Sequence, residues 1–144
     1  MRRTAMMCAA FLMAFPALAQ QPEGFERLAT RVGLVVLGNA QEFEVLTSAG
    51  SEKNRYFCAA GEFAHIRLGA RSSDQLLVAS RMVGSRYQSH RRAYVFRLAG
   101  EGRQDRFSLH MGGPRVGQVL SVGHARGMCD AVLRRAGRQK RDDD

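Results

Sequence analysis

Residues 55–69, which read RYFCAAGEFAHIRLG, are the stretch that decides the fold. Apolar side chains recur in this stretch at the spacing of an α-helix, whereas Glu62 and Arg67 fall largely outside the apolar stripe. The glycine at position 69 is a common signal for the end of a helix. The pattern predicts an amphipathic helix over residues 55–68. The stripe consists of Tyr56, Ala59, Ala60, Phe63, Ala64 and Leu68.

Strand-like segments lie on both sides of this helix. Residues 31–37 are rich in β-branched residues and leucine, residues 43–47 alternate with period two, and Gly38-Asn39 lies between them. This arrangement is typical of a β-hairpin. Downstream of the helix, four more segments separated by glycine-containing turns are predicted as strands: residues 75–83, 93–98, 106–111 and 116–122.

The pattern within these strands indicates the fold class. Tyr94, Phe96 and Leu98 alternate with smaller or polar residues, which gives the strand one apolar face. Such alternation is typical of an antiparallel sheet that is covered on one side. We therefore predict an α+β fold in which the helix covers one face of an antiparallel sheet of five or six strands. The fold forms a single domain over residues 20–133, and the charge-dense residues 134–144 are predicted to be a disordered tail.

The first nineteen residues have the organisation of a cleavable signal peptide. Arg2-Arg3 is followed by an apolar run over residues 5–15 and by Ala17-Leu18-Ala19. These segments correspond to the charged region, the hydrophobic region and the cleavage site of secretory signals. We expect residues 1–19 to be removed, which leaves about 125 residues and one hydrophobic core. The mature protein is therefore predicted to be periplasmic or secreted, without a transmembrane segment.

Export affects how the cysteines are interpreted. Cys8 leaves with the signal peptide, so Cys58 and Cys129 remain as a pair with one possible connectivity. An oxidising compartment favours a disulfide between them, whereas a metal-bound or reactive thiol is the alternative. The bond would close a loop of about 70 residues and contribute about 4 kcal/mol in the chain-entropy treatment.

The sequence of the predicted helix also resembles that of a group of known proteins. Its segment Tyr56-Phe57-Cys58-Ala59-Ala60-Gly61-Glu62-Phe63-Ala64, followed by Leu68-Gly69 and by a late Gly-Met-Cys at residues 127–129, resembles small secreted proteins of alphaproteobacteria that have no assigned function. The resemblance covers about the middle third of the chain and the final cysteine. It implies a periplasmic protein with one disulfide, and it implies no catalytic residue.

The chain is strongly basic, with a formal net charge of +9, and arginine supplies nearly all of the positive charge. An arginine-rich codon usage explains such a composition without any function, whereas a selected role would be anion binding, because guanidinium binds carboxylate and phosphate in a bidentate manner. Residues 81–92, RMVGSRYQSHRR, concentrate four arginines, a histidine and a tyrosine between two predicted strands. We take Arg86, Tyr87, Arg91 and Arg92 as the candidate anion-binding site. The alternative is an ordinary exposed hairpin end.

A second group of residues, on the predicted helix, has side chains that could bind a metal ion or act in catalysis. Cys58, Glu62 and His65 are spaced i, i+4 and i+7, which places a thiol, a carboxylate and an imidazole along one stripe. If Cys58 is oxidised, Glu62 and His65 are simply neighbours at the edge of the helix. We expect the second situation and predict no metal site.

The remaining titratable residues show no known catalytic spacing. His90, His110 and His124 lack the spacing of metal ligands, and Glu42 and Glu44 share a strand face without the aromatic residues of a sugar cleft. We predict no catalytic residue and no cofactor. The preferred hypothesis is a non-catalytic domain that binds an anionic partner, either an envelope component or an acidic protein. The alternatives are a small secreted hydrolase with an unrecognised site and a structural or inhibitory module of the envelope.

Overall fold

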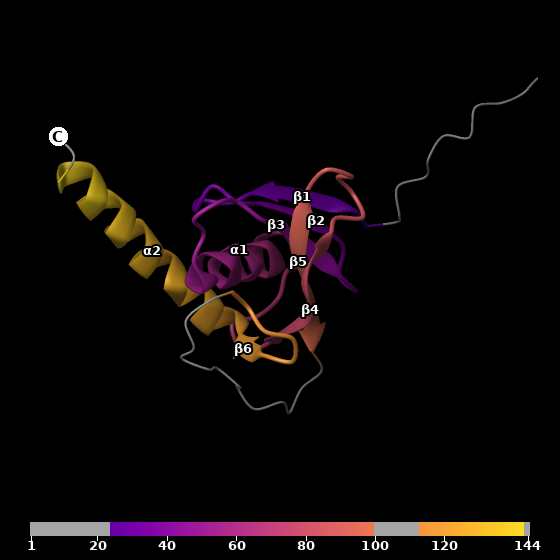
Figure 1. Ribbon diagram of the computed structural model, residues 1–144. Helices are drawn as coiled ribbons and strands as arrows, with labels where there is room; N and C mark the ends of the chain where they lie inside the picture. Colours follow the sequence, from indigo (N-terminus) through magenta and orange to yellow (C-terminus); the bar gives the residue numbers. More distant parts are fainter. Residues whose placement is uncertain (1–23, 100–112, 143–144) are drawn as a thin grey trace, which may run out of the picture.

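A computed structural model describes residues 24–99 and 113–142 of the chain (Figure 1). The signal peptide predicted at residues 1–19 and the strand predicted at residues 106–111 lie outside the described residues. The elements in chain order are β1 (Glu26–Ala29), β2 (Val35–Gly38), β3 (Phe43–Leu46), α1 (Lys53–Ile66), β4 (Gln75–Gly84), β5 (Arg92–Ala99), β6 (Val119–Ser121) and α2 (Val122–Asp142).

The strands form one six-stranded sheet in the order β1-β2-β3-β5-β4-β6, and all the pairs are antiparallel. The predicted α+β class with an antiparallel sheet is confirmed. The first strand of the predicted hairpin is shorter than expected and begins at Val35. Residues 30–33 form a turn instead, in which Gly33 has a φ of 74° and donates from its N–H to the carbonyl of Thr30 at 2.9 Å. The edge strand β1 was not predicted.

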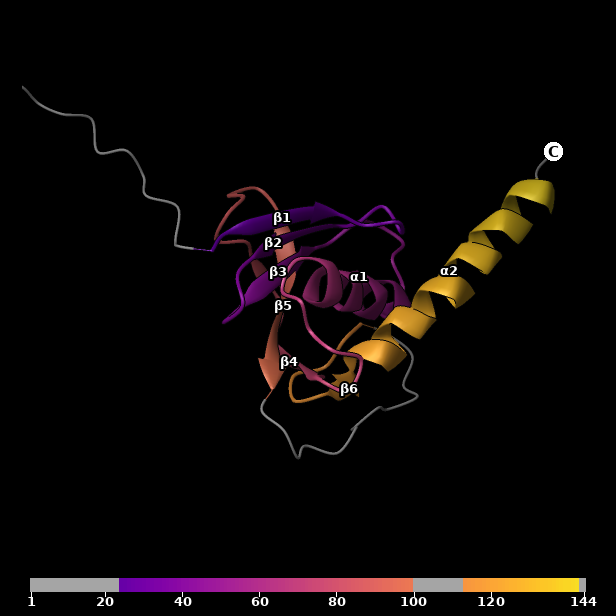
Figure 2. The same cartoon turned by 180° about the vertical axis from the view of Figure 1, so that it is seen from behind.

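Helix α1 is more deeply buried than an amphipathic surface helix. Every residue from Tyr56 to Ala64 is buried, because α1 lies between the sheet on one side and α2 on the other (Figure 2). On the sheet side, Phe63 packs against Phe43 with ring centroids 4.9 Å apart, and Phe57 meets Phe96 edge-on at 5.6 Å. These aromatic side chains form the centre of the hydrophobic core.

The region that contains helix α2 differs from two of the predictions. The strand predicted at residues 116–122 is limited to Val119–Ser121, and the segment predicted as a disordered tail is helical as far as Asp142. Apolar residues recur along the first half of α2 at helical spacing, so this half is anchored on α1, and helix-forming residues extend it further. The anchoring residues are Val122, Ala125, Met128, Cys129 and Val132. The second half extends beyond the rest of the domain (Figure 1).

The Cys58–Cys129 disulfide joins the two helices, as predicted, with 4.9 Å between the Cα atoms. Both cysteines are fully buried. The bond therefore fixes α2 on α1 from within the core. Among the described residues, no helix combines the length and the apolar character needed to cross a membrane.

Gly61 allows the close approach of the two helices. A Cβ atom at this position would lie 2.9 Å from the Cβ of Ala125 and 3.0 Å from the backbone nitrogen of Arg126. Since backbone atoms cannot move aside cheaply, we expect Gly61→Ala to lower the free energy of unfolding by about 1–3 kcal/mol despite its better helix propensity.

Gly137→Ala in α2 is the matched control for this prediction. A Cβ atom at Gly137 meets nothing within 4 Å, so propensity alone predicts a gain of up to about 1 kcal/mol. Urea unfolding of the two variants measures both values. Equal effects of the two substitutions would mean that the helices do not approach closely at Gly61.

Candidate functional site

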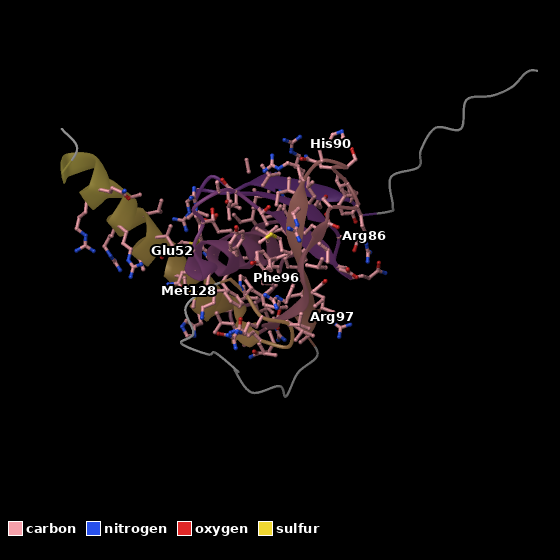
Figure 3. All side chains as sticks on the ribbon, in the orientation of Figure 1. Glu52, Arg86, His90, Phe96, Arg97 and Met128 are labelled. Carbon is pink, nitrogen blue, oxygen red and sulfur yellow. A yellow bond between two sulfur atoms is a disulfide. The ribbon has the colours of Figure 1, made fainter. Side chains whose placement is uncertain are left out.

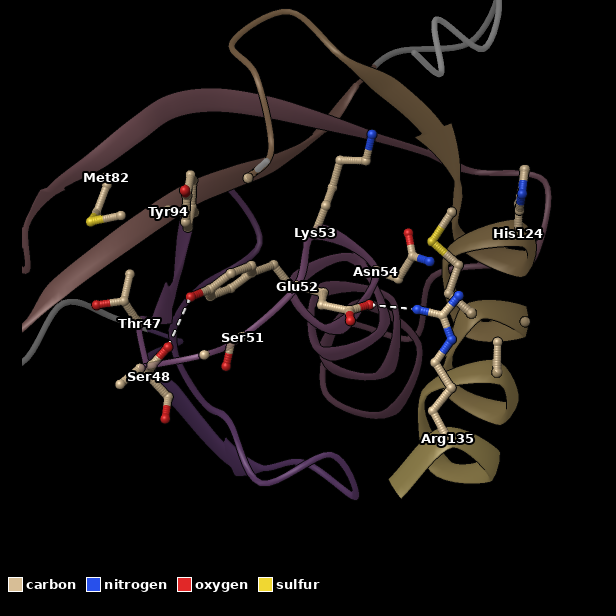
Figure 4. A pocket seen from close by; sticks show the side chains of 17 residues that line it. Thr47, Ser48, Ser51, Glu52, Lys53, Asn54, Met82, Tyr94, His124 and Arg135 are labelled. Carbon is tan, nitrogen blue, oxygen red and sulfur yellow. Dashed lines mark hydrogen bonds and ion pairs between the residues drawn. The ribbon is translucent and has the colours of Figure 1, made fainter. Parts of the chain in front are cut away.

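A wide, open pocket of about 1220 Å³ lies at the N-terminal end of α1 (Figure 4). Its walls come from the loop before α1, the first residues of α1, one side of α2, and strands β4 and β5. The lining residues are Thr47, Ser48, Ala49, Gly50, Ser51, Glu52, Lys53, Asn54, Tyr56, Met82, Tyr94, Gly113, His124, Gly127, Met128, Ala131 and Arg135. Segments far apart in the sequence therefore meet in one concave surface.

Helices α1 and α2 each contribute a positively charged side chain to the pocket lining. Lys53 in the first turn of α1 is buried, with 8% of its surface exposed. Burial lowers the pKa of its amine, and the nearby charge of Arg115 lowers it further. On the opposite wall, Arg135 of α2 pairs with Glu52 at 2.9 Å, as the dashed line in Figure 4 shows. Glu52 is the one carboxylate among the lining residues, and it already has a cation as its partner.

Two further arginines, Arg81 of β4 and Arg92 of β5, lie close to a residue that lines the pocket. Tyr94 lines the pocket, and burial raises the pKa of its hydroxyl, while the positive charges of Arg81 and Arg92 act in the opposite direction. Both guanidinium groups are therefore close enough to influence the Tyr94 hydroxyl. Lys53 and Arg135 line the pocket, whereas Arg81, Arg92 and Arg115 add positive charge close to its lining residues without lining it themselves.

The N-terminus of α1 adds polar groups to the same wall. Glu52 occupies the N-cap position without making a side-chain hydrogen bond to the helix, and the first turn contains no acidic residue. The hydroxyl oxygen of Ser51 is buried and has no hydrogen-bond partner. Free backbone N–H groups and the helix dipole favour negative charge at such a position. Glu52 is therefore the one negative group of the lining at this end of α1, and its carboxylate pairs with Arg135 instead of capping the helix.

Apolar and aromatic side chains form the rest of the pocket. The rings of Tyr56 and Tyr94 lie 4.7 Å apart between their centroids, and the Tyr56 hydroxyl donates to the carbonyl of Ser48 at 3.4 Å. Met82 from β4 and Met128 from α2 complete this surface. The pocket therefore combines an apolar wall with a cationic wall.

Two of the predicted anion-binding residues belong to an intramolecular network. Glu44, which is buried, accepts hydrogen bonds from the Ser85 hydroxyl at 2.6 Å and from the backbone N–H of Arg86 at 3.0 Å. The guanidinium of Arg86 pairs with Glu42 at 3.2 Å, and Tyr87 packs on Phe25 with ring centroids 4.9 Å apart. Arg86 contacts both carboxylates, through its backbone N–H to Glu44 and through its guanidinium to Glu42.

The other two predicted residues lie beside the pocket. The Nη2 atom of Arg91 donates to the carbonyl of Thr47 at 3.0 Å, and that of Arg92 donates to the carbonyl of Met82 at 2.9 Å. Thr47 and Met82 both line the pocket. The predicted set is therefore divided, because Arg91 and Arg92 are held at the pocket rim whereas Arg86 lies with His90 at the far end of the domain from α2 (Figure 3).

The predicted stripe of Cys58, Glu62 and His65 does not converge on one point. Glu62 is buried and accepts hydrogen bonds from the backbone N–H of Arg31 at 3.1 Å and from its Nε. The Nδ1 atom of His65 lies 3.1 Å from the carbonyl of Ala70. Cys58, Glu62 and Cys129 are the one group of possible metal ligands within the described ranges, and its two sulfur atoms are bonded to each other.

Sequence reasoning missed much of the pocket. Lys53 is one of only two lysines in the chain, and it directly precedes the predicted helix, which could have drawn attention to it. His124 was expected on or beside the strand predicted at residues 116–122, and Arg135 was expected in a disordered tail, whereas both lie in α2. His110, the remaining histidine considered above, lies outside the described residues.

Comparisons with known proteins give no further indication of function. No family model matches the chain, and no curated protein and no solved structure shows a significant match to it.

Proposed function

We propose that the protein is a non-catalytic domain that works outside the cytosol and binds an anionic ligand in the pocket at the N-terminus of α1. The observation that carries this proposal is that Lys53 and Arg135 line one pocket whose single described carboxylate, Glu52, is already paired. Arg81, Arg92 and Arg115 do not line the pocket, but their charges influence the lining residues Tyr94 and Lys53.

The arginines of the rim are held in position before any ligand arrives. Arg92 uses one nitrogen for the carbonyl of Met82, and Arg135 uses one for Glu52. A guanidinium has five donors, so each of the two can still bind an anion in a bidentate manner. Because these side chains are already oriented, less conformational entropy is lost on binding.

The location is proposed from two features. Residues 1–19 have the organisation of a secretory signal, and the Cys58–Cys129 disulfide is the kind of bond that persists in oxidising compartments. The natural ligand is then an anionic component of the periplasm or of the cell envelope. This proposal differs from a polyanion-binding surface, because the cations surround a concave site.

Tripolyphosphate is a suitable probe for this proposal, since it is small, multiply charged and has no apolar part. We expect isothermal titration to detect its binding to the oxidised chain from residue 20, with an affinity that falls as salt is added. Replacing Lys53 and Arg135 together by glutamine should reduce the affinity about tenfold or more, because charged hydrogen bonds to the anion are lost.

Arg134 and Arg138 provide a control with the same change in net charge. Both are exposed on the second half of α2, and neither lines the pocket. Their double replacement by glutamine should leave the affinity within about twofold, because exposed charges that do not contact the ligand are screened by salt. Equal losses in the two double variants would mean that binding follows net charge alone, and no binding to the unmodified protein would favour a structural module instead.

A further inference from the structure

We propose that the ligand of this pocket is a small amphiphilic anion, with its charged head at the N-terminus of α1 and its apolar body against Met82, Tyr94 and Met128. This inference rests on the proposed function and specifies the class of ligand. Its basis is that apolar side chains of β4, β5 and α2 line the same pocket as Lys53 and Arg135.

The apolar wall is larger than anion binding alone requires. A site for a small inorganic anion needs donors and positive charge, whereas here Tyr56 and Tyr94 form a tilted aromatic pair on the pocket surface. Met82 remains 38% exposed at the mouth, although it is a large apolar residue. Methionine adapts to irregular apolar partners, and it is common at binding surfaces for that reason.

The polar wall provides the complementary end of the site. Lys53 is buried, Ser51 has a buried hydroxyl without a partner, and Glu52 turns its carboxylate to Arg135. Figure 4 shows Met82 and Tyr94 on one side of the pocket and Arg135 on the other, with Lys53 between them. A carboxylate or phosphate head placed beside Lys53 would gain a charge-assisted hydrogen bond in a partly desolvated site.

The size of the pocket agrees with a ligand of this class. Pockets for organic ligands commonly enclose about 300–1,000 Å³ and are mostly apolar with a few placed polar groups. The volume of about 1220 Å³ includes an open mouth and exceeds the requirement of a single phosphate. A fatty acid, an aromatic acid or a lipid fragment has dimensions of this order.

Two fluorescent probes that share an apolar body test the inference. 1-Anilinonaphthalene-8-sulfonate carries a negative charge, and N-phenyl-1-naphthylamine is its uncharged counterpart. We expect both to bind the oxidised protein, with the sulfonate binding about tenfold more tightly or better because of its additional ionic contact. Lys53→Met should remove most of this preference and leave the affinity for the uncharged probe unchanged.

Met82→Glu tests the apolar wall, and Val83→Glu is its matched control. The two residues are neighbours on β4 with almost equal exposure, 38% and 39%, but only Met82 lines the pocket. We expect Met82→Glu to weaken both probes, the anionic one more strongly, and Val83→Glu to change neither by more than about twofold. Circular dichroism and the melting temperature confirm that each variant is folded.

The possible results separate the two proposals. Binding of tripolyphosphate without binding of either probe would overturn the amphiphilic ligand and leave the anion site intact. Binding of both probes with equal affinity, unaffected by Lys53→Met, would overturn the placement of the charged head. Binding of the uncharged probe alone would contradict the proposed function as well.

Discussion

Reduction of the Cys58–Cys129 disulfide is expected to lower the free energy of unfolding by about 4 kcal/mol. The bond joins residues 71 positions apart, and this long closed loop restricts the unfolded chain considerably. The loss is comparable to the whole stability of a small domain, which is typically about 5–15 kcal/mol. Urea unfolding of the oxidised and reduced protein, followed by circular dichroism, measures the difference.

The variant with Cys58→Ala and Cys129→Ala is the control for this measurement. It should resemble the reduced protein and should not respond to reductant. Because both sulfur atoms are buried between α1 and α2, its near-ultraviolet spectrum should also report looser packing of the helices. An unchanged urea midpoint after complete reduction would contradict the role assigned to the bond.

Replacement of Arg31 by methionine is expected to cost about 3 kcal/mol of stability. The carboxylate of Glu62 is buried, with 2% of the residue exposed, and Arg31 provides both of its described hydrogen bonds. Without the guanidinium, the carboxylate of Glu62 stays buried, and the backbone N–H of residue 31 is its remaining described partner. This expected loss of stability is at the low end of the range for removing one partner of a buried ion pair, because the Arg31 side chain is itself 57% exposed.

Two further variants separate charge burial from general effects of losing an arginine. Arg27→Met removes an exposed arginine of β1 and should change stability by no more than about 0.5 kcal/mol. Adding Glu62→Gln to Arg31→Met should recover part of the loss, since an amide is less costly to bury than a charge. A cost for Arg31→Met no larger than that of Arg27→Met would show that Glu62 does not depend on its partner.

The parts of the fold that could be predicted from the sequence are those with strong local patterns. The helix around Tyr56 has regular apolar spacing, and the strand containing Tyr94 alternates clearly. Helix α2 was missed because Gly123 and Gly127 interrupt its apolar pattern and because its second half has the composition of a disordered segment. Packing of Ala125 and Met128 on α1 outweighs these local signals.

The candidate site was only partly predictable for a similar reason. Arg81 and Arg92 are close in the sequence, so the basic segment at residues 81–92 identified them together. Lys53 and Arg135 meet in the pocket only after α1 and α2 have packed, and no spacing along the chain indicates that they would. Arg86 was selected for its type, yet its guanidinium pairs with Glu42.

A crystal structure of the oxidised protein with tripolyphosphate tests the central claim most directly. The account predicts that the anion lies in the pocket at the N-terminus of α1, within hydrogen-bonding distance of Lys53 or Arg135. An anion bound instead at Arg134 and Arg138 on the second half of α2, or at Arg86, with the pocket empty, would contradict it.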